Sequence, residues 1–266
     1  MLVYIINLPK HTERRKHLAE RFAAAGLEPI WVEAVDGHAI ADEEIAARAA
    51  YPRAGSYALS RTQYGCYLSH LKCWQAFLAT DQSHAAIFED DIHLGEGFGS
   101  FLHEAQRHFP ADGDLVKLET CLQLVRMPAR PISKISDRDL YRLASRHLGA
   151  AAYIVSRKGA RKLEENSDKF SMGVDAILFN PRPLLKHPMV AYQVDPAICI
   201  QDDIAYRCGL PQLGFSSANP VPKSKRSYGT SRVQHCLYLL RDSLRRLKLR
   251  MGYLTAGCRK RLVDFR

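Results

Sequence analysis

The segment Ala85-Ala86-Ile87-Phe88-Glu89-Asp90-Asp91 joins a short apolar run to three consecutive carboxylates. An apolar run of this length is typical of a strand that is buried inside a sheet. Adjacent carboxylates raise each other's pKa unless a cation or hydrogen bonds compensate them. Oxygen-rich groups of this kind suit hard divalent ions such as Mg²⁺ or Mn²⁺, which also bind diphosphates. The alternative is a solvated acidic turn that ends the strand.

Two earlier apolar segments also end in polar residues. Residues 2–8 form an apolar run that reaches Asn7 near its end, and residues 29–34 are followed closely by Asp36. In open α/β sheets, ligands bind beyond the carboxyl ends of the strands. Three polar strand ends in one chain therefore predict a binding site at one edge of a sheet.

Helical and extended patterns alternate along the chain, which predicts an α/β fold with flanking helices. Gly26 is placed to end the first helix, and Ser156 is placed to begin the last one. The polar residues 133–146 are predicted to form a loop or an edge strand. The predicted helices cover residues 12–25, 42–50, 65–79, 101–109 and 157–165, and the predicted strands cover residues 2–8, 29–34, 85–88, 114–118 and part of 186–200.

The 266-residue chain is long enough for one large domain or two small ones, and its 47% hydrophobic and 25% charged content is typical of a globular protein. Its net charge of +10 is concentrated in residues 221–266, which contain 13 Lys or Arg and 2 Asp or Glu. We therefore divide the chain into a main domain, residues 1–220, and a basic tail, residues 221–266. The nearly neutral main domain lacks the basic surface of a nucleic-acid-binding domain.

The tail contains a basic amphipathic pattern, in which leucines recur at helical spacing with Arg and Lys between them. Such a helix can bind an anionic lipid surface, where each basic residue contributes about 1 kcal/mol. A terminal helix packed on the main domain is the alternative. No apolar stretch approaches the roughly 20 residues of a membrane span, and the N-terminus has the pattern of a strand rather than a signal peptide. The leucines are Leu237, Leu240, Leu244 and Leu247.

Several common motifs are absent. The seven cysteines include no Cys-x-x-Cys pair, which favours reduced thiols in the cytoplasm over a disulfide framework or a zinc site. The chain also lacks Gly-x-Gly-x-x-Gly after its first strand, a phosphate loop, His-Glu-x-x-His and Gly-x-Ser-x-Gly. These absences argue against dinucleotide oxidoreductases, P-loop enzymes, zinc proteases and serine hydrolases.

At its polar strand ends the chain resembles family 25 of glycosyltransferases, which includes bacterial lipooligosaccharide galactosyltransferases and the collagen galactosyltransferases. The resemblance extends over about residues 2–204. Each matching segment is weak alone, but their order and spacing together are specific. The segments are Ile5-Ile6-Asn7-Leu8 with Glu13-Arg14-Arg15, Ala34-Val35-Asp36-Gly37, Gly65-Cys66-Tyr67-Leu68-Ser69-His70 with Trp74, Phe88-Glu89-Asp90-Asp91, and Ala152-Tyr153-Ile154-Val155-Ser156-Arg157-Lys158-Gly159-Ala160 with Val174-Asp175.

The resemblance implies a GT-A-like, Rossmann-like sheet that binds a nucleotide sugar, most often UDP-galactose, together with Mn²⁺ or Mg²⁺. The acidic triplet matches the family's metal-binding motif, with Glu instead of Asp at its first position. By this match Asp91 is the expected direct metal ligand. Glu89 or Asp90 would bind the ribose, or the metal through a water molecule.

Inversion in this family requires a base near the acceptor hydroxyl. Asp175 is the first choice for this base, with Glu119 and Asp203 behind it. The alternative for Asp175 is a cap on a helix over residues 176–179.

The other matched residues are expected to bind the donor. Asn7 and Asp36, with Leu8 and Gly37 beside them, would contact the uridine, although Asn7 and Asp36 also suit hydrogen bonds to turn backbone. Arg14 would approach the diphosphate, or would lie on a solvated helix face.

Ser69 and His70 lie one turn before Trp74 on a predicted helix, and they would line the donor pocket. A buried core histidine is the alternative for His70. Gln201 matches a family segment near the end of the catalytic domain.

Together these features predict a metal-dependent, inverting bacterial glycosyltransferase that moves galactose from UDP-galactose to a sugar of a lipopolysaccharide or lipooligosaccharide precursor. A glucosyl- or other hexosyltransferase of the same fold, or a non-catalytic sugar-nucleotide-binding module, is the alternative. The expected partners are a UDP-hexose, a glycolipid or oligosaccharide acceptor and, through the tail, an anionic membrane surface, but no nucleic acid. The expected location is the cytoplasm, at the inner face of the inner membrane.

Overall fold

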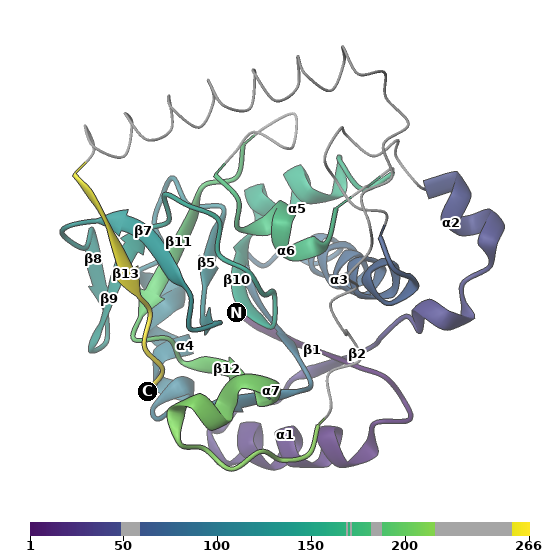
Figure 1. Ribbon diagram of the computed structural model, residues 1–266, viewed down its shortest axis with the longest axis horizontal. Coiled ribbons are helices and arrows are strands. Elements are labelled where there is room, and N and C mark those ends of the chain that lie inside the picture. The colour runs from purple at the N-terminus through teal and green to yellow at the C-terminus, as the bar shows by residue number, and fades with distance from the viewer. Residues whose placement is uncertain (49–58, 169, 171, 182–187, 216–256) are drawn as a thin grey trace.

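The computed structural model describes residues 1–48, 59–168, 170, 172–181, 188–215 and 257–266. Within them a mixed eight-stranded sheet, in the order β2-β1-β3-β10-β5-β11-β9-β8, forms the centre of the molecule (Figure 1). A three-stranded sheet, β4-β12-β6, and a two-stranded sheet, β13-β7, complete the β-structure of these residues. The expected α/β class with flanking helices is confirmed.

The strands are β1 (Leu2–Asn7), β2 (Ile30–Glu33), β3 (His84–Glu89), β4 (Ile92–Leu94), β5 (Leu115–Lys117), β6 (Glu119–Thr120), β7 (Leu124–Pro128), β8 (Ser133–Ile135), β9 (Arg138–Arg142), β10 (Ala152–Ser156), β11 (Ala191–Asp195), β12 (Cys199–Gln201) and β13 (Cys258–Leu262). The helices are α1 (Thr12–Ala24), α2 (Asp42–Arg48), α3 (Arg61–Leu78), α4 (Phe98–Arg107), α5 (Arg157–Glu164), α6 (Val174–Leu178) and α7 (Asp202–Ala205), with short 3-10 helices η1 (Gly37–Ala39) and η2 (Tyr206–Cys208).

Strand β1 is parallel to both of its neighbours, β2 and β3. Asn7 lies opposite Glu33 on one side, and Ile6 lies opposite Glu89 on the other. The carboxyl ends of these three strands therefore meet at one edge of the sheet, where ligands bind in folds of this class. Strand β10 is antiparallel to β3 and to β5, so the sheet as a whole is mixed.

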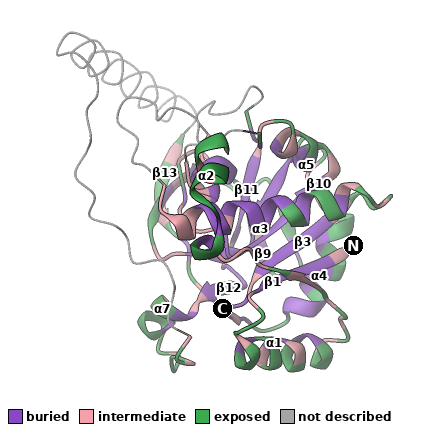
Figure 2. Ribbon diagram, turned by 90° about the vertical axis from the view of Figure 1, so that its right-hand side faces the viewer, coloured by how far each residue is buried: buried purple, intermediate pink, exposed green. Residues whose placement is uncertain are grey.

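Helices cover both faces of the sheet (Figure 2). In β1, Tyr4 and Ile6 belong to the core cluster that contains α3 side chains, while Val3 and Ile5 belong to the cluster that contains α1 and α4 side chains. Successive strand side chains point to opposite faces, so a strand covered on both faces must be apolar throughout. This explains the unbroken apolar pattern at the start of the chain.

Some boundaries differ from the sequence prediction. Helix α3 begins at Arg61, four residues before its predicted start, because Ser60 and Gln63 form a capping box. The polar residues 133–146 contain β8 and β9, an antiparallel pair at the edge of the main sheet. The sequence does not predict β4 or β6, because strands of three and two residues carry too little pattern.

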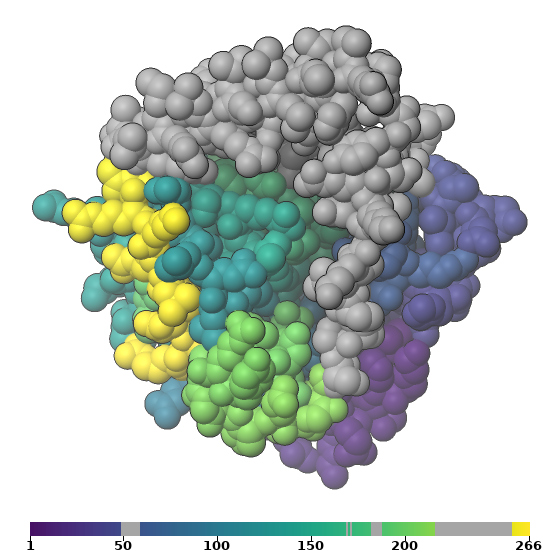
Figure 3. All heavy atoms as spheres, in the orientation of Figure 1, coloured from purple at the N-terminus to yellow at the C-terminus, as the bar shows by residue number. Residues whose placement is uncertain are grey.

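The last ten residues of the chain belong to the main body. Strand β13 is antiparallel to β7 and lies on the surface of the molecule (Figure 3, yellow). Val263 is completely buried, and Arg138 donates a hydrogen bond to the backbone oxygen of Arg266 (2.8 Å). Residues 257–266 are therefore tied to the body, and the division of the chain at residue 221 stays a prediction. The tail leucines Leu237, Leu240, Leu244 and Leu247 lie outside the described residues.

Among the residues that the structure describes, no helix is long and apolar enough to cross a membrane. The six cysteines in this part of the chain are all free thiols, which agrees with the expectation of reduced cysteines. They are Cys66, Cys73, Cys121, Cys199, Cys208 and Cys258.

Candidate active site

A cavity of about 610 Å³ opens at the carboxyl ends of β1, β2 and β3. It brings together the N-terminus of α1, the loop after β2, helix α3, the acidic triplet after β3 and residues that follow β12. Asn7 lies behind the cavity wall, and Glu119, Asp175 and Asp203 are not part of the lining. The predicted site residues in the lining are Leu8, Arg14, Asp36, Gly37, Ser69, His70, Glu89, Asp90, Asp91 and Gln201.

Two glycines let the loop after β2 approach α3 closely. A Cβ on Gly37 would collide with the backbone oxygen of Arg61, and a Cβ on Gly65 would lie 2.5 Å from that of Val35. Ser69 stabilises this contact between the loop and α3. Its hydroxyl accepts a hydrogen bond from Val35 N (2.8 Å) and donates one to Gly65 O (2.7 Å). Ser69 therefore fixes this wall of the cavity through its hydroxyl.

Asp36 is held in its ionised form at the rim of the cavity. It accepts hydrogen bonds from Lys10 Nζ (2.7 Å) and from the backbone nitrogen of His38 (3.0 Å). These two hydrogen bonds, that of Lys10 first, lower the pKa of Asp36. A carboxylate in this state can accept a hydrogen bond from a ligand hydroxyl or ring N–H.

Asp90, the middle carboxylate of the triplet, is compensated by its neighbours. It accepts hydrogen bonds from Arg14 Nη1 (2.8 Å) and Asn7 Nδ2 (2.7 Å), and His11 Nδ1 lies 3.4 Å away. Arg14 and Asp90 are both buried, so solvent screens their attraction only weakly. Asp90 therefore positions Arg14 and retains little capacity for a further cation.

Asp91, the third carboxylate, has weaker compensation, because the charge of Arg14 and a hydrogen bond of Gln201 only partly oppose the effect of its burial. Its buried Oδ1 has no hydrogen-bond partner, and its Oδ2 lies 3.9 Å from Arg14 Nη1. Burial, followed by the charges of Glu89 and Asp90, raises the pKa of Asp91 to about 8. A nearby cation reverses such a shift, because it favours the charged form of the carboxylate.

The chemistry of this site therefore fits a hard divalent ion such as Mn²⁺ or Mg²⁺. Asp91 would be its direct ligand, and Glu89, which is a fifth exposed toward the cavity, would be a second oxygen ligand.

Glu89, the first carboxylate, belongs to a different set of contacts. Its Oε1 lies 3.2 Å from His70 Nε2 and 3.7 Å from Cys66 Sγ, and its Oε2 accepts from Gln201 Nε2 (3.3 Å). His70 is fully buried and also contacts the hydroxyl of Tyr153 (2.9 Å). His70 thus combines both expected roles, since it is a satisfied buried histidine and lines the cavity.

Glu119 lies outside the cavity and is completely buried. Its Oε2 accepts from Lys117 Nζ (2.8 Å) and from the backbone nitrogen of Ala151 (2.9 Å). Burial raises the pKa of Glu119, and Lys117 opposes this shift. Such enclosure argues against contact between Glu119 and an acceptor hydroxyl, and favours a structural ion pair.

Asp175 lies in the first turn of α6, where Gly173 and not Asp175 is the N-cap. A quarter of its side chain is exposed, and it forms an ion pair with Arg146 (3.3 Å). Burial, with smaller contributions from nearby charges that include Asp175, raises the pKa of the Cys66 thiol. Asp203 is exposed on α7.

Lys10, His11, Cys66 and Phe215 are among the cavity-lining residues that the sequence interpretation did not name as site residues. Lys10 and His11 directly precede α1, and a basic pair before a helix N-terminus is a signal for anion binding. Cys66 belongs to a Cys-x-x-x-His spacing, which places both side chains on one helix face. Phe215 carries no such signal, since it is held there by a hydrogen bond from its backbone nitrogen to Asp202 (2.9 Å).

Comparisons with known proteins show the family of the chain. The model of a family described as "Glycosyltransferase family 25 (LPS biosynthesis protein)" matches residues 1–178. A "Putative glycosyltransferase" of Haemophilus influenzae is 28% identical over 93% of this chain and 85% of its own length. "Lacto-N-neotetraose biosynthesis glycosyltransferase LgtE" of Neisseria gonorrhoeae is 30% identical over 75% of this chain and 73% of its own length. "Lipooligosaccharide biosynthesis protein lic2B" of Haemophilus influenzae is 26% identical over 76% and 77%.

Among solved structures, a glycosyltransferase involved in the glycosylation of the major capsid of PBCV-1 aligns with 80% of this chain and 95% of its own. The identity is 9% and the TM-score is 0.38.

Proposed function

Because the chain belongs to glycosyltransferase family 25, a family of lipopolysaccharide-biosynthesis proteins, it is a glycosyltransferase, and we propose that it transfers galactose from UDP-galactose with inversion and with a divalent metal ion. The observation that carries this proposal is the buried, unpartnered oxygen of Asp91 in a cavity at the strand ends. The acceptor that we propose is an oligosaccharide of a lipopolysaccharide or lipooligosaccharide precursor, which the names of two relatives support.

The donor diphosphate would lie between Asp91 and the N-terminus of α1. Residues 12–14 line the cavity there, and the first N–H groups of a helix have no partners within the helix and attract anions. Lys10 and Arg14 add positive charge to the same wall. A divalent ion bound at Asp91 would neutralise the charge that develops on the leaving diphosphate. The uridine would reach Asp36 and the loop that Gly37 begins.

We assign the general base to Asp175. As the acceptor oxygen bonds to the anomeric carbon and the bond to UDP breaks, the hydroxyl proton would pass to the Asp175 carboxylate. Asp175 is partly exposed and its partner Arg146 is half-exposed, so the carboxylate can exchange that partner for an acceptor. Glu119 has no comparable freedom, because Lys117 and backbone enclose it.

The direct test is hydrolysis and transfer with a panel of UDP-sugars, each with and without Mn²⁺. We expect Asp91→Asn to lower the rate about 100-fold or more, since a metal ion contributes several kcal/mol to this chemistry. Asp81→Asn changes an exposed carboxylate outside the cavity and is expected to leave the rate unchanged. If the enzyme turned over another UDP-hexose faster than UDP-galactose, the proposed donor would be wrong. If the protein neither bound nor turned over any UDP-sugar, the whole proposal would be refuted.

We also propose that residues 237–249 hold the protein on the anionic inner face of the inner membrane. Deletion of the whole tail does not test this, because residues 257–266 belong to the main body. Substitution of Arg241, Arg245, Arg246 and Lys248 by Gln keeps the chain length and removes the basic charge of this segment. We expect this variant to lose sedimentation with phosphatidylglycerol vesicles, and undiminished sedimentation would contradict the proposal.

A further inference from the structure

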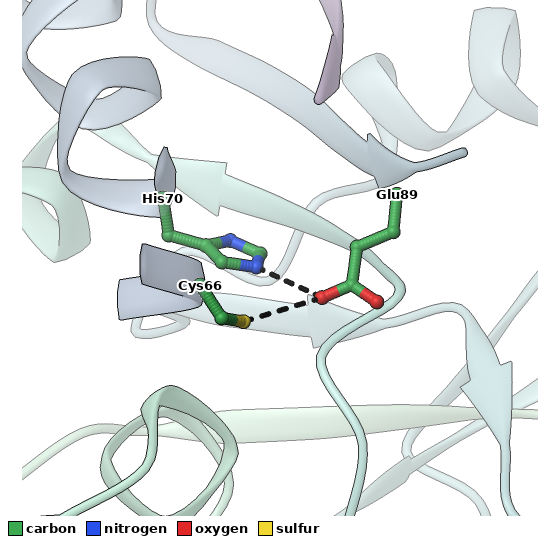
Figure 4. Close-up of side chains that lie close together, drawn as sticks. All are labelled: Cys66, His70 and Glu89. Carbon is green, nitrogen blue, oxygen red and sulfur yellow. Dashed lines mark hydrogen bonds and ion pairs between the residues drawn. The ribbon is translucent and has the colours of Figure 1, made fainter. Parts of the chain in front are cut away.

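A second group of metal-ligating side chains lies in the same cavity. Cys66 and His70 project from α3, and Glu89 at the end of β3 faces both of them (Figure 4). The three ligand atoms, Cys66 Sγ, His70 Nε2 and Glu89 Oε1, all lie within 4.8 Å of one another. Helix geometry accounts for half of this arrangement, because residues four apart share a helix face. The packing of α3 on the sheet supplies the rest, because it places this helix face beside Glu89 at the end of β3.

The two distances from Glu89 to the other ligand atoms match those of a tetrahedral metal site. Metal bonds of about 2.0–2.3 Å at tetrahedral angles separate neighbouring ligand atoms by about 3.3–3.7 Å. Glu89 Oε1 lies 3.2 Å from His70 Nε2 and 3.7 Å from Cys66 Sγ. A cation can therefore bind between these atoms with little movement of the side chains.

Buried neighbours hold two of the three ligands in place. His70 Nδ1 lies 2.9 Å from the hydroxyl of Tyr153, which accepts a hydrogen bond from Trp74 Nε1 (2.8 Å). His70, Trp74 and Tyr153 are all fully buried. On the other side, Gln201 donates to Glu89 Oε2 (3.3 Å) and leaves Oε1 to the cluster. Partners of this kind orient metal ligands and increase metal affinity.

We propose that Cys66, His70 and Glu89 form a Zn²⁺ site, separate in chemistry from the Asp91 site, with a fourth coordination position that opens into the cavity. Thiolate, imidazole and carboxylate are the ligands that Zn²⁺ prefers, whereas an oxygen-only site suits Mn²⁺ and Mg²⁺. On binding, the Cys66 thiol releases its proton to solvent, and neutral His70 binds the metal through Nε2 as the tautomer whose single N–H, on Nδ1, donates to the hydroxyl of Tyr153. A search of the sequence for Cys-x-x-Cys cannot detect this site, because its ligands come from a helix and from a separate strand.

Bound Zn²⁺ would occupy part of the donor cavity and share Glu89 with the catalytic centre. We therefore expect Zn²⁺ to inhibit turnover, and only this expectation rests on the proposed function.

The test is Co²⁺ and Zn²⁺ binding to the full-length protein, with a phosphine reductant because thiol reductants bind these metals. In the wild type we expect a thiolate-to-cobalt charge-transfer band that Zn²⁺ abolishes. Cys66→Ser changes a single atom and is expected to eliminate the band. It should also weaken Zn²⁺ binding, measured against a chromophoric chelator, by more than about 100-fold, since loss of even an outer partner costs about 10- to 100-fold.

Two variants separate this site from its alternatives. Cys208→Ser removes an exposed thiol, and Asp91→Asn removes the oxygen ligand of the proposed catalytic metal; both are expected to retain the band. A wild-type protein without the band at saturating Co²⁺, or a Cys66→Ser variant that keeps it, would overturn the zinc site. An Asp91→Asn variant that loses glycosyl transfer but keeps the band would support both the catalytic role of Asp91 and the separate zinc site. The two proposals can therefore be refuted independently of each other.

Discussion

At the residue scale, three carboxylates that are adjacent in sequence occupy three different environments. Asp90 accepts hydrogen bonds from Arg14 and Asn7. Asp91 has a buried oxygen without a hydrogen-bond partner, and Glu89 contacts a histidine and a thiol. Alternation of side chains around the strand end separates them, and Arg14 bonds closely to only one. The neighbours of each carboxylate therefore decide which one is available to a metal.

Arg14 is expected to contribute to stability as well as to donor binding. Arg14→Met removes a close partner from the buried carboxylate of Asp90, and loss of one member of a buried pair costs about 3–5 kcal/mol. Urea denaturation should show a decrease of this order in the free energy of unfolding, with part of it recovered in the double variant Arg14→Met/Asp90→Asn. The control is Lys16→Met on the exposed face of α1. Equal effects of the two single variants would contradict this account.

Substitution of Asp175 and of Glu119 by the corresponding amide is expected to have different effects on turnover and on stability. Asp175→Asn should reduce turnover about 100- to 10,000-fold, the range of a general base, with less than about 1 kcal/mol lost in stability because its ion pair is partly exposed. Glu119→Gln leaves Lys117 buried without its charge partner, so its main effect should be on unfolding. Steady-state kinetics and urea unfolding of both variants check this, and the reverse pattern would transfer the base to Glu119.

His147 is expected to make stability depend on pH. Burial, with a smaller effect of Lys117, lowers its pKa from 6.5 to about 3. Below pH 6.5 this histidine is therefore protonated in the unfolded chain but still neutral in the folded protein. The free energy of unfolding then falls by about 1.4 kcal/mol for each pH unit. His147→Gln should flatten this dependence between pH 7.5 and 5, whereas His103→Gln, at an exposed histidine of α4, should not. Parallel curves for all three proteins would show that His147 is not the cause.

At the element scale, α3 provides most of one cavity wall. Its successive turns carry Gly65 and Ser69 against the loop after β2, and Cys66 and His70 toward Glu89. The capping box at Ser60 fixes where this helix begins. A change in the contact between α3 and the loop is therefore expected to alter the cavity directly.

Gly65→Ala should destabilise the protein although alanine is the better helix former. Helix propensity alone predicts a gain of about 1 kcal/mol, but the new Cβ would lie 2.5 Å from the backbone oxygen of Val35. We expect a lower melting temperature and weaker UDP binding. Ala76→Gly, at an exposed position of the same helix, measures the propensity effect by itself. A gain in stability from Gly65→Ala would mean that the loop can move away without cost.

At the scale of the whole molecule, the two ends of the polypeptide share one body. Strand β13 completes the two-stranded sheet with β7, and Arg138 donates to the backbone oxygens of Arg266, Pro196, Ala197 and Glu96. The backbone of Ala197 also donates a hydrogen bond to Asp264 O (2.7 Å) and accepts one from Arg266 N (3.1 Å). The C-terminal residues therefore stabilise the region that leads into β12 and Gln201.

A chain that ends at residue 256 is expected to be less stable throughout. It loses the β7 pairing and the burial of Val263, and it leaves Arg138 with one acceptor fewer. Burial of a valine and loss of a hydrogen bond to a buried charged group each contribute about 1.5–3 kcal/mol, so urea unfolding should shift by several kcal/mol. The comparison is Val263→Ala in the full chain, which should show a smaller loss. An unchanged midpoint for the shortened chain would contradict a stabilising role.

Much of the architecture follows from local pattern. The runs at residues 2–8 and 85–88 predict buried strands because a sheet covered on both faces requires continuous apolar sequence, and Gly26 and Ser156 mark helix ends through their backbone preferences. The short strands β4 and β6, and β13 at the end of a basic segment, give no comparable signal. Their positions depend on pairing with distant residues.

The sequence by itself determined the fold class, the family and the strand ends at which the cavity forms, because hydrophobic period and motif order are local properties of the chain. Only the tertiary structure decided that Arg14 compensates Asp90 and not Asp91, that Glu119 is enclosed by Lys117, and that Cys66 and His70 meet Glu89. These outcomes depend on distances between side chains that are remote in sequence. Charge compensation and burial act through space, so folding had to bring the groups together before their roles could be distinguished.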